Sequence, residues 1–308
     1  VGVDRPKIVG NPWVVGSGGD THVIPVVGVN AAGYIYCMQQ QPNSYTVDNY
    51  KSQGPDDYED FAILGSTVAT TMMYPNLIKK ADGNYAIWNR ITSAYYACIA
   101  QSTSELESWG TNTAITNITI GSTRHYISTP HNPNVGTWFY TLISRRYDGS
   151  LNWSAFFLLK TQDFSTFYNW EGTVSVTPPS TLSDTNLDSD FSYFIGSSAT
   201  QYCIPVACMS PQGKFYCVIK DSSGDHVLWR RNAGDTAWED VVITGISNIA
   251  DNATIGADAQ GSAALQIVAY SDTNIELIIR VDEGAYYRPQ RWKSTDRGDT
   301  WIYIESPF

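Results

Sequence analysis

Short apolar runs separated by polar turns recur along this chain and predict strands. Residues 24–37 align without a gap with residues 204–217. In both stretches an apolar run that begins Ile-Pro is followed by a turn containing glycine, and then by a second run of β-branched and aromatic residues. This order is typical of a β-hairpin. Proline is tolerated at the start of the first strand because that position can lack a hydrogen-bonded partner.

Three further stretches follow the hairpin pattern. Residues 74–85 repeat it closely, residues 129–140 more loosely, and residues 265–279 without the proline. The turns carry glycine, or Asn274 in the last copy, where a positive φ is expected. Self-similarity along a chain is the signature of a repeat architecture. The sequence therefore predicts an all-β fold built from repeated antiparallel units.

A second recurring segment follows each hairpin. Residues 294–301 read Ser-Thr-Asp-Arg-Gly-Asp-Thr-Trp, and degenerate versions occur at residues 52–61, 102–109, 161–167 and 232–238. Residues 294–301 resemble the Asp-box, S-x-D-x-G-x-T-W, of the sialidase-like β-propellers. The resemblance implies four-stranded antiparallel blades and a structural turn, in which aspartate and glycine hold the backbone and tryptophan packs between strands. The residues given this structural role are Ser294, Asp296, Gly298, Thr300 and Trp301.

The repeat predicts one β-propeller domain over residues 1–308. We expect about five blades, at roughly residues 1–62, 63–115, 116–180, 181–248 and 249–308. Sialidase-like propellers usually have six blades, so a sixth blade, partly formed by residues 1–20 and by the long interval between Pro130 and Pro205, stays open. Residues 7–15 are candidates for a strand that completes the last blade and protects its edge.

Composition narrows the classes of partner. The formal net charge of −11 disfavours non-specific binding to nucleic acid or to an anionic membrane. No apolar run of 18 residues predicts a membrane span, and the first ten residues do not resemble a signal peptide. The four histidines lack zinc-binding spacing, and no nucleotide-binding motif occurs, so we expect neither metal nor cofactor. The five cysteines are predicted to be mostly buried thiols; whether any pair is bonded stays open.

The resemblance assigns the B–C and D–A loops of each blade to the ligand-binding face. Arginine forks bind carboxylates, phosphates and sulfates, and aromatic rings stack on sugars. Cations near the ends of the second strands and aromatic residues in the B–C loops therefore predict binding of an acidic glycan. The alternative is that long loops simply carry soluble charges. The predicted ligand-binding residues are Arg90, Arg145, Tyr147, Trp153, Lys220, His226, Arg280 and Tyr286.

Two comparisons with the sialidase motifs argue against catalysis. Val23 stands where the first arginine of the sialidase triad is expected in the sequence before Ile-Pro. Tyr270 lies in a Tyr-Ser-Asp sequence like that around the sialidase nucleophile, but the repeat places it next to an A–B turn, away from the ligand face. A glycosidase of another type needs two suitably spaced carboxylates. The candidates in that case are Asp148, Asp225, Asp282 and Glu283.

The leading hypothesis is a non-catalytic propeller that binds a surface glycan or a glycosylated host receptor, as an attachment protein of a phage or another virus does. This hypothesis predicts an extracellular or virion-surface location and contacts with other virion or cell-surface proteins. The alternative is a glycoside hydrolase or lyase of the sialidase-like superfamily that acts on an acidic polysaccharide. A second alternative is a structural assembly module, which predicts a large apolar patch on one face.

Overall fold

The structure is a computed structural model of the chain. It describes residues 26–40, 47–57, 60–66, 72–91, 97–104, 106–117, 123–131, 133–147, 153–178, 181–183, 205–220, 225–232, 237–250, 264–284 and 286–305. The chain divides into two compact units, Val1–Ile115 and Thr116–Phe308. Residues 7–15, 23 and 148 lie outside the described residues. In the described part, no helix is long and apolar enough to cross a membrane.

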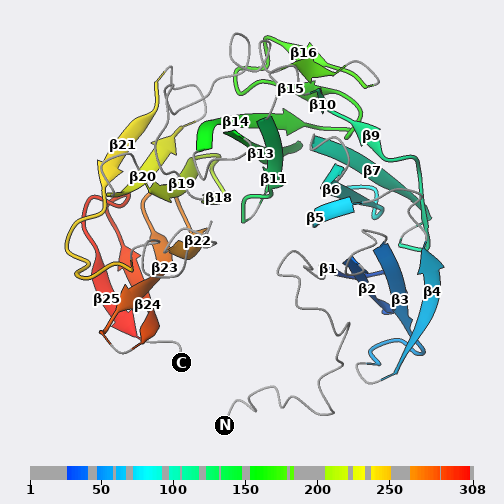
Figure 1. The fold of residues 1–308 in the computed structure, drawn as a ribbon, viewed down its shortest axis with the longest axis horizontal. Helices are drawn as coiled ribbons and strands as arrows, with labels where there is room; N and C mark the ends of the chain where they lie inside the picture. Colours follow the sequence, from blue (N-terminus) through cyan, green and yellow to red (C-terminus); the bar gives the residue numbers. More distant parts are fainter. Residues whose placement is uncertain are drawn as a thin grey trace. The chain divides into compact units, whose positions relative to one another are not determined.

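The unit Val1–Ile115 contains two antiparallel sheets (Figure 1). The first sheet is β1 (Val26–Val29), β2 (Ile35–Gln40), β3 (Val47–Ser52) and β4 (Phe61–Ser66), paired in chain order. It ends a few residues beyond the expected boundary at residue 62. The second sheet is β5 (Met72–Lys79), β6 (Tyr85–Ile91) and β7 (Ala97–Ser104), with β8 (Ser108–Trp109) and β9 (Thr113–Ala114) both pairing with β7.

The unit Thr116–Phe308 contains three larger antiparallel sheets. The third sheet has β11 (Thr123–Ser128), β13 (Trp138–Tyr147), β14 (Trp153–Thr161), β15 (Phe167–Tyr168) and β16 (Ser175–Val176) in order, with β12 (Asn134–Val135) also pairing with β13. The fourth sheet is β18 (Val206–Met209), β19 (Phe215–Lys220), β20 (His226–Arg231) and β21 (Glu239–Val242). β10 (Thr116–Asn117) and β17 (Leu182–Ser183) form a short parallel pair.

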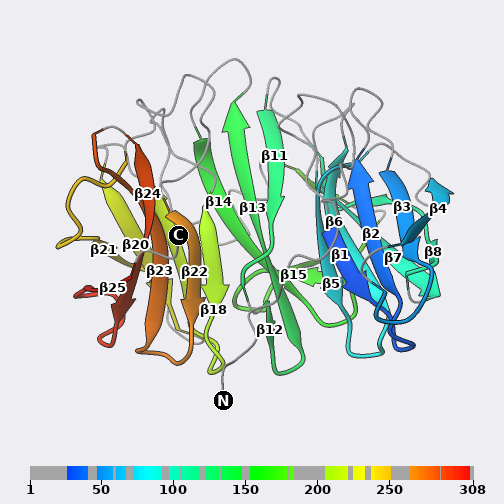
Figure 2. The same cartoon turned by 90° about the horizontal axis from the view of Figure 1, so that it is seen from below.

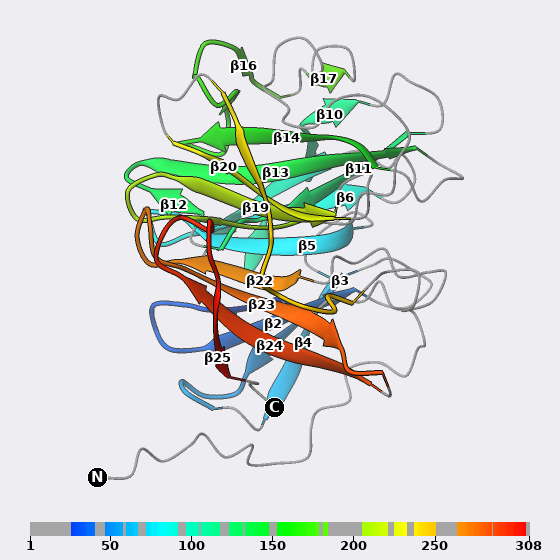
Figure 3. The same cartoon turned by 90° about the vertical axis from the view of Figure 1, so that its left-hand side faces the viewer.

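The fifth sheet is β22 (Ala264–Ala269), β23 (Ile275–Asp282), β24 (Tyr287–Ser294) and β25 (Ile302–Glu305), and Figure 3 shows these strands following one another. Sequence-order antiparallel pairing recurs in all five sheets of the described residues. This pairing confirms the all-β prediction and makes each sheet a blade-like unit.

The hairpin turns explain why the repeat is visible in sequence. Gly33, Gly83 and Gly213 have φ of 87°, 87° and 95°, a conformation that favours glycine. The expectation of a positive φ at Asn274 is wrong, because Asn274 is not among the described residues with positive φ. In that turn the Ser271 hydroxyl accepts hydrogen bonds from the amides of Thr273 (3.3 Å) and Asn274 (3.0 Å), so a side chain closes the turn instead.

Neighbouring sheets within a unit pack through apolar faces. In the second unit, Tyr216 and Leu228 of the fourth sheet share a core with Ile275 and Leu277 of the fifth. In the first unit, Tyr36 and Met38 of the first sheet and Tyr85 and Ile87 of the second belong to one core. A four-stranded sheet alone leaves an apolar face in water, so each sheet is stabilised by the one beside it.

The intact segment, residues 294–301, and its four degenerate versions each connect the third and fourth strands of a sheet. In residues 294–301 the Asp296 carboxylate accepts hydrogen bonds from the Thr300 amide (2.9 Å), the Thr300 hydroxyl (2.6 Å) and the Ser294 hydroxyl (2.7 Å). Asp163 accepts from the amides of Ser165 and Thr166, both at 2.8 Å. The residue after each aspartate, Arg297 or Phe164, has a positive φ. The two turns therefore share one local geometry.

These turns also contact the hairpin turn of their own sheet. The Arg297 amide donates to the Thr273 carbonyl at 3.1 Å, and in the first sheet the Asp56 amide donates to the Gly33 carbonyl at 3.0 Å. Both connections therefore lie at the same end of the sheet. We call this the turn end, and we call the opposite end, where the second strands finish, the loop end.

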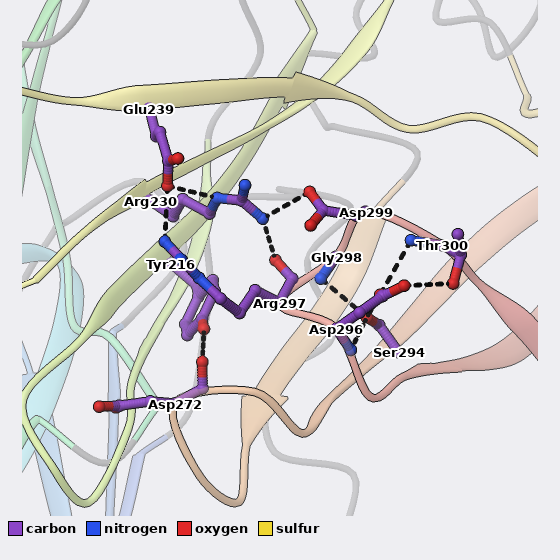
Figure 4. A network of polar contacts seen from close by, with 10 residues as sticks. All are labelled: Tyr216, Arg230, Glu239, Asp272, Ser294, Asp296, Arg297, Gly298, Asp299 and Thr300. Atoms are coloured by element: carbon purple, nitrogen blue, oxygen red, sulfur yellow. Dashed lines mark hydrogen bonds and ion pairs between the residues drawn. The ribbon is translucent and has the colours of Figure 1, made fainter.

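Ion pairs join neighbouring sheets at the turn end. Figure 4 shows Arg230 of β20 donating to Glu239 (2.8 Å) and to the Arg297 carbonyl (2.7 Å), and pairing with Asp299 (2.9 Å). Arg297 donates to the same Glu239 carboxylate at 2.6 Å. Equivalent pairs join Lys51 to Glu107 and Arg231 to Glu171. The Arg230–Glu239 pair lies within the fourth sheet, and the other pairs cross from one sheet to the next. Ion pairs therefore stabilise the turn end in addition to apolar packing.

Replacing Asp296 with alanine is expected to lower the free energy of unfolding by about 1–2 kcal/mol at neutral pH, because three hydrogen bonds to the carboxylate are lost. The Thr300 hydroxyl and amide, with Ser294, lower the pKa of Asp296 to about 2. The native contribution is thus complete above the unfolded pKa of about 4 and disappears as the pH falls toward 2. Denaturant unfolding at several pH values should show the difference from wild type shrinking over that window. Asp240→Ala, at an exposed position, is the control; an equal effect there would contradict the assignment.

Replacing Gly298 with alanine is expected to cost about 2–4 kcal/mol of stability, from a strained φ and a steric clash together. Gly298 has a φ of +95°, and an added Cβ would lie 2.1 Å from Leu228 Cδ2 of the neighbouring sheet. Gly245→Ala is the matched control, because Gly245 has a φ of +82° with nothing within 4 Å of an added Cβ. Thermal unfolding should rank Gly298→Ala well below Gly245→Ala; equal losses would show that the clash is relieved.

Candidate functional site

The predicted cations all lie at the loop end of their sheets. In the second unit, Lys220 pairs with His226 across β19 and β20, and Arg280 pairs with Pro289 across β23 and β24. Arg145 pairs with Ala155 near the end of β13, a strand that Figure 2 shows rising to the loops. In the first unit, Arg90 pairs with Ala97, the first residue of β7. The register thus brings a cation to the loop end of each of these four sheets.

Most of these cations are buried. The exposed fractions are 2% for Arg90, 5% for Arg145 and 4% for Lys220, and His226 is exposed by only 6%. Arg280 is partly exposed. The Arg145 guanidinium lies 5.4 Å from the centroid of the Phe157 ring. These side chains therefore lie within the loop end of their sheets, and Arg280 is the most exposed of the four predicted cations.

His125 is a further loop-end residue that the predicted ligand set omits. It is fully buried on β11, directly opposite Arg145 on β13. Its Nδ1 lies 2.9 Å from the hydroxyl oxygen of Thr116, which is also fully buried. In the sequence His125 lies in a D–A connection, which the resemblance assigns to the ligand-binding face, but the local pattern gives it no partner. Its position beside Arg145 follows from the β11–β13 register, which is not readable from the local pattern.

The β23–β24 connection holds the exposed part of the candidate site. Asp282 and Glu283 begin the connection, and Tyr286, with an exposed fraction of 54%, ends it. The Asp282 carboxylate accepts a hydrogen bond from the Gly284 amide at 2.7 Å, and the Asp282 amide donates to the Asn248 carbonyl at 2.8 Å. The guanidinium of Arg288 lies 5.5 Å from the centroid of the Tyr286 ring.

The remaining predicted residues are placed as follows. Tyr147 ends β13 and Trp153 begins β14, so both backbones lie at the loop end of the third sheet. Asp225 is exposed immediately before β20. Tyr270 follows β22 and starts the turn into β23, so it lies at the turn end, as the repeat predicts. Its hydroxyl donates to Glu276 at 3.1 Å.

The four cysteines that the structure describes are free thiols, and three of them are buried. Cys98, Cys208 and Cys217 are buried and free, and Cys37 is free and partly buried. Burial raises the pKa of the thiols of Cys37, Cys208 and Cys217, which disfavours the reactive thiolate. Among the described residues no group of three or more His, Cys, Asp or Glu side chains is arranged to hold a metal ion.

Comparison with known proteins identifies the fold. The sequence matches no known family and no curated protein. A solved structure of a polysaccharide lyase of family PL25, an ulvan lyase, superposes with a TM-score of 0.74 over 95% of this chain and 72% of the other, at 13% identity. The polysaccharide lyase Uly1 superposes with a TM-score of 0.61 over 94% of this chain and 69% of the other, at 11% identity.

This chain is a β-propeller. The five sheets of the described residues are accordingly blades, and the fold class predicted from the repeat is confirmed. At identities this low, the likeness establishes the fold and leaves the chemistry to the residues of this chain. Within each unit, the loop end of the blades carries the cations described above.

Proposed function

We propose that this propeller recognises an acidic polysaccharide at the loop end of its blades, as a non-catalytic binding protein at the surface of a virion or cell. The observation that carries the proposal is the recurrence of a cation at the end of the second strand: Arg145, Lys220 and Arg280 in the second unit and Arg90 in the first. These cations recur at one place in the repeat of a protein whose net charge is −11. Such cations suit carboxylate or sulfate groups.

The fold comparison supports the choice of ligand to test first. In a second solved structure the PL25 ulvan lyase is bound to GlcA(1-4)Rha3S, with the same TM-score of 0.74 and 13% identity to this chain. The proposal extends that ligand class, an acidic glycan, to this protein.

We also propose that residues 294–301 are an Asp-box and that the chain belongs to the sialidase-like propellers. The support is the turn itself: Asp296 accepts hydrogen bonds from Thr300 and Ser294, the Gly298 amide donates to the Ser294 hydroxyl at 2.7 Å, and Trp301 is buried. The turn at Asp163, where the carboxylate accepts from the amides of Ser165 and Thr166, supports this proposal.

A lyase that acts on an acidic polysaccharide is the second candidate function. It is favoured by the buried His125, which is held by Thr116 and lies opposite Arg145. Elimination from a uronate needs a group that moves a proton and a cation that neutralises the carboxylate. In this candidate function His125 moves the proton and Arg145 neutralises the carboxylate. The hydrolase alternative is less favoured, because Asp282 is engaged by the Gly284 amide and Glu283 lies 3.6 Å from Arg288.

Binding to immobilised ulvan should weaken with rising salt, because screening reduces attraction between charges. Arg280→Gln is expected to weaken binding about tenfold, the loss typical of a charge-assisted hydrogen bond. Lys293→Gln is the matched control, because it removes the same charge from a strand of the same blade, close to the turn end. Binding that is unchanged in Arg280→Gln, or equally reduced in both variants, would contradict the proposed site.

Incubation of the wild-type protein with ulvan should release no unsaturated uronate if the protein only binds. Ultraviolet absorbance of the product detects elimination directly. If cleavage occurs, the lyase function replaces the leading one, and Thr116→Val should then change the pH profile of cleavage, because the hydrogen bond to His125 Nδ1 is lost. Thr116→Ser, which keeps the hydroxyl, should restore the wild-type profile. An identical profile in all three proteins would exclude His125 as the proton-transfer group.

A further inference from the structure

The β23–β24 connection offers an exposed aromatic ring next to an exposed cation. Tyr286 is 54% exposed and the Arg288 side chain 42% exposed. By contrast, the exposed fractions of Arg145, Lys220 and His226 in the same unit are 4–6%. Tyr286 and Arg288 are therefore available to a ligand without any movement of the loops.

The described residues of this connection are held by hydrogen bonds of their backbone. The Asp282 side chain accepts from the Gly284 amide at 2.7 Å, and the Glu283 amide donates to the Tyr286 carbonyl at 3.1 Å. Gly284 has a φ of 85°, which fits the tight turn. The Asp282 amide is bound to the Asn248 carbonyl, and Ile249 forms a bridge with Val281. These contacts restrain the backbone on both sides of the turn, which lowers the entropic cost of binding a ligand at Glu283 and Tyr286.

Arg288 is held between two groups that leave its charge only weakly neutralised. Its guanidinium lies 5.5 Å from the centroid of the Tyr286 ring, and its Nη2 donates to the Tyr286 hydroxyl at 3.4 Å. The carboxylate that faces it, Glu283, is 3.6 Å from its Nε, which is too long for a good hydrogen bond. An anion with better geometry can therefore displace Glu283.

We propose that Tyr286 and Arg288 form a subsite for one sugar unit that carries an anionic substituent. The sugar ring packs on Tyr286, and the substituent binds the Arg288 guanidinium in place of Glu283. This inference rests on the proposed function and adds to it the position of a binding subsite and the role of Glu283. In the subsite Glu283 is an internal competitor of the ligand, which differs from the acid–base role that it would have in a hydrolase.

The test uses affinity electrophoresis with three polymers: dextran sulfate, polygalacturonate and uncharged dextran. Dextran sulfate carries sulfate and polygalacturonate carries carboxylate, so the two distinguish the kinds of anion, and dextran reports stacking alone. Tyr286→Ala and Arg288→Gln are each expected to weaken binding to an anionic polymer about tenfold, the effect of losing a central aromatic or arginine contact. Glu283→Gln is expected to tighten binding about two- to fivefold, because it removes an exposed ion pair of modest strength.

Two controls separate this subsite from general effects. Tyr270→Ala removes another exposed tyrosine of the same blade, with an exposed fraction of 55%, at the turn end, and should leave binding unchanged. Tyr286→Phe keeps the ring and should retain most of the affinity. Thermal midpoints within a few degrees of the wild type would show that each variant is folded.

The outcomes distinguish failure of the subsite from failure of the proposed function. If the wild type binds an anionic polymer but Tyr286→Ala and Arg288→Gln bind as tightly as Tyr270→Ala, the subsite is wrong and the proposed function stands. If Glu283→Gln weakens binding, the competitor role is wrong. If the wild type binds none of the three polymers, both proposals are contradicted.

Discussion

The packing of one blade face against the next is the constraint on which the rest of this structure depends. A four-stranded sheet has two faces, and the apolar residues of one face are stabilised only when a neighbouring sheet covers them. In the second unit Tyr216, Leu228, Ile275 and Leu277 fill one such interface. Gly298 shows how close the approach is, because a methyl group at that position would overlap Leu228 of the adjoining blade.

The charged residues at the two ends of the blades have different surroundings. At the turn end, carboxylates and cations connect one blade to the next: Glu239 with Arg297, and Glu107 with Lys51. Hydrogen bonds from Arg230 and Lys51 hold the pKa of Glu239 and Glu107 below their ordinary values. These charged groups therefore stabilise the turn end. The loop end carries the recurring cations, and Tyr286 is exposed there.

The sequence predicted the parts of the fold that depend on local patterns. Alternating apolar runs and turn glycines located the hairpins, since Gly33, Gly83 and Gly213 have the positive φ that glycine adopts most easily. The repeat also put Tyr270 at the turn end and Lys220 and Arg280 at the loop end, because strand register follows from turn position. It was wrong at Asn274, where the Ser271 side chain closes the turn. It placed His125 at the ligand-binding end but did not include His125 or Arg288 among the predicted ligand-binding residues.

The sequence by itself determined the repeat, the order of strands in each blade and the end of the blade on which each residue lies, because these follow from interactions between residues close in the chain. Only the tertiary structure decided that Arg145 and Lys220 are buried while Tyr286 is exposed. It alone showed that Thr116 holds His125, and that Arg230 of one blade binds the Arg297 carbonyl of the next. Burial and pairing of this kind arise from contacts between segments far apart in sequence, whose energies depend on three-dimensional packing and leave no periodic signal in the chain.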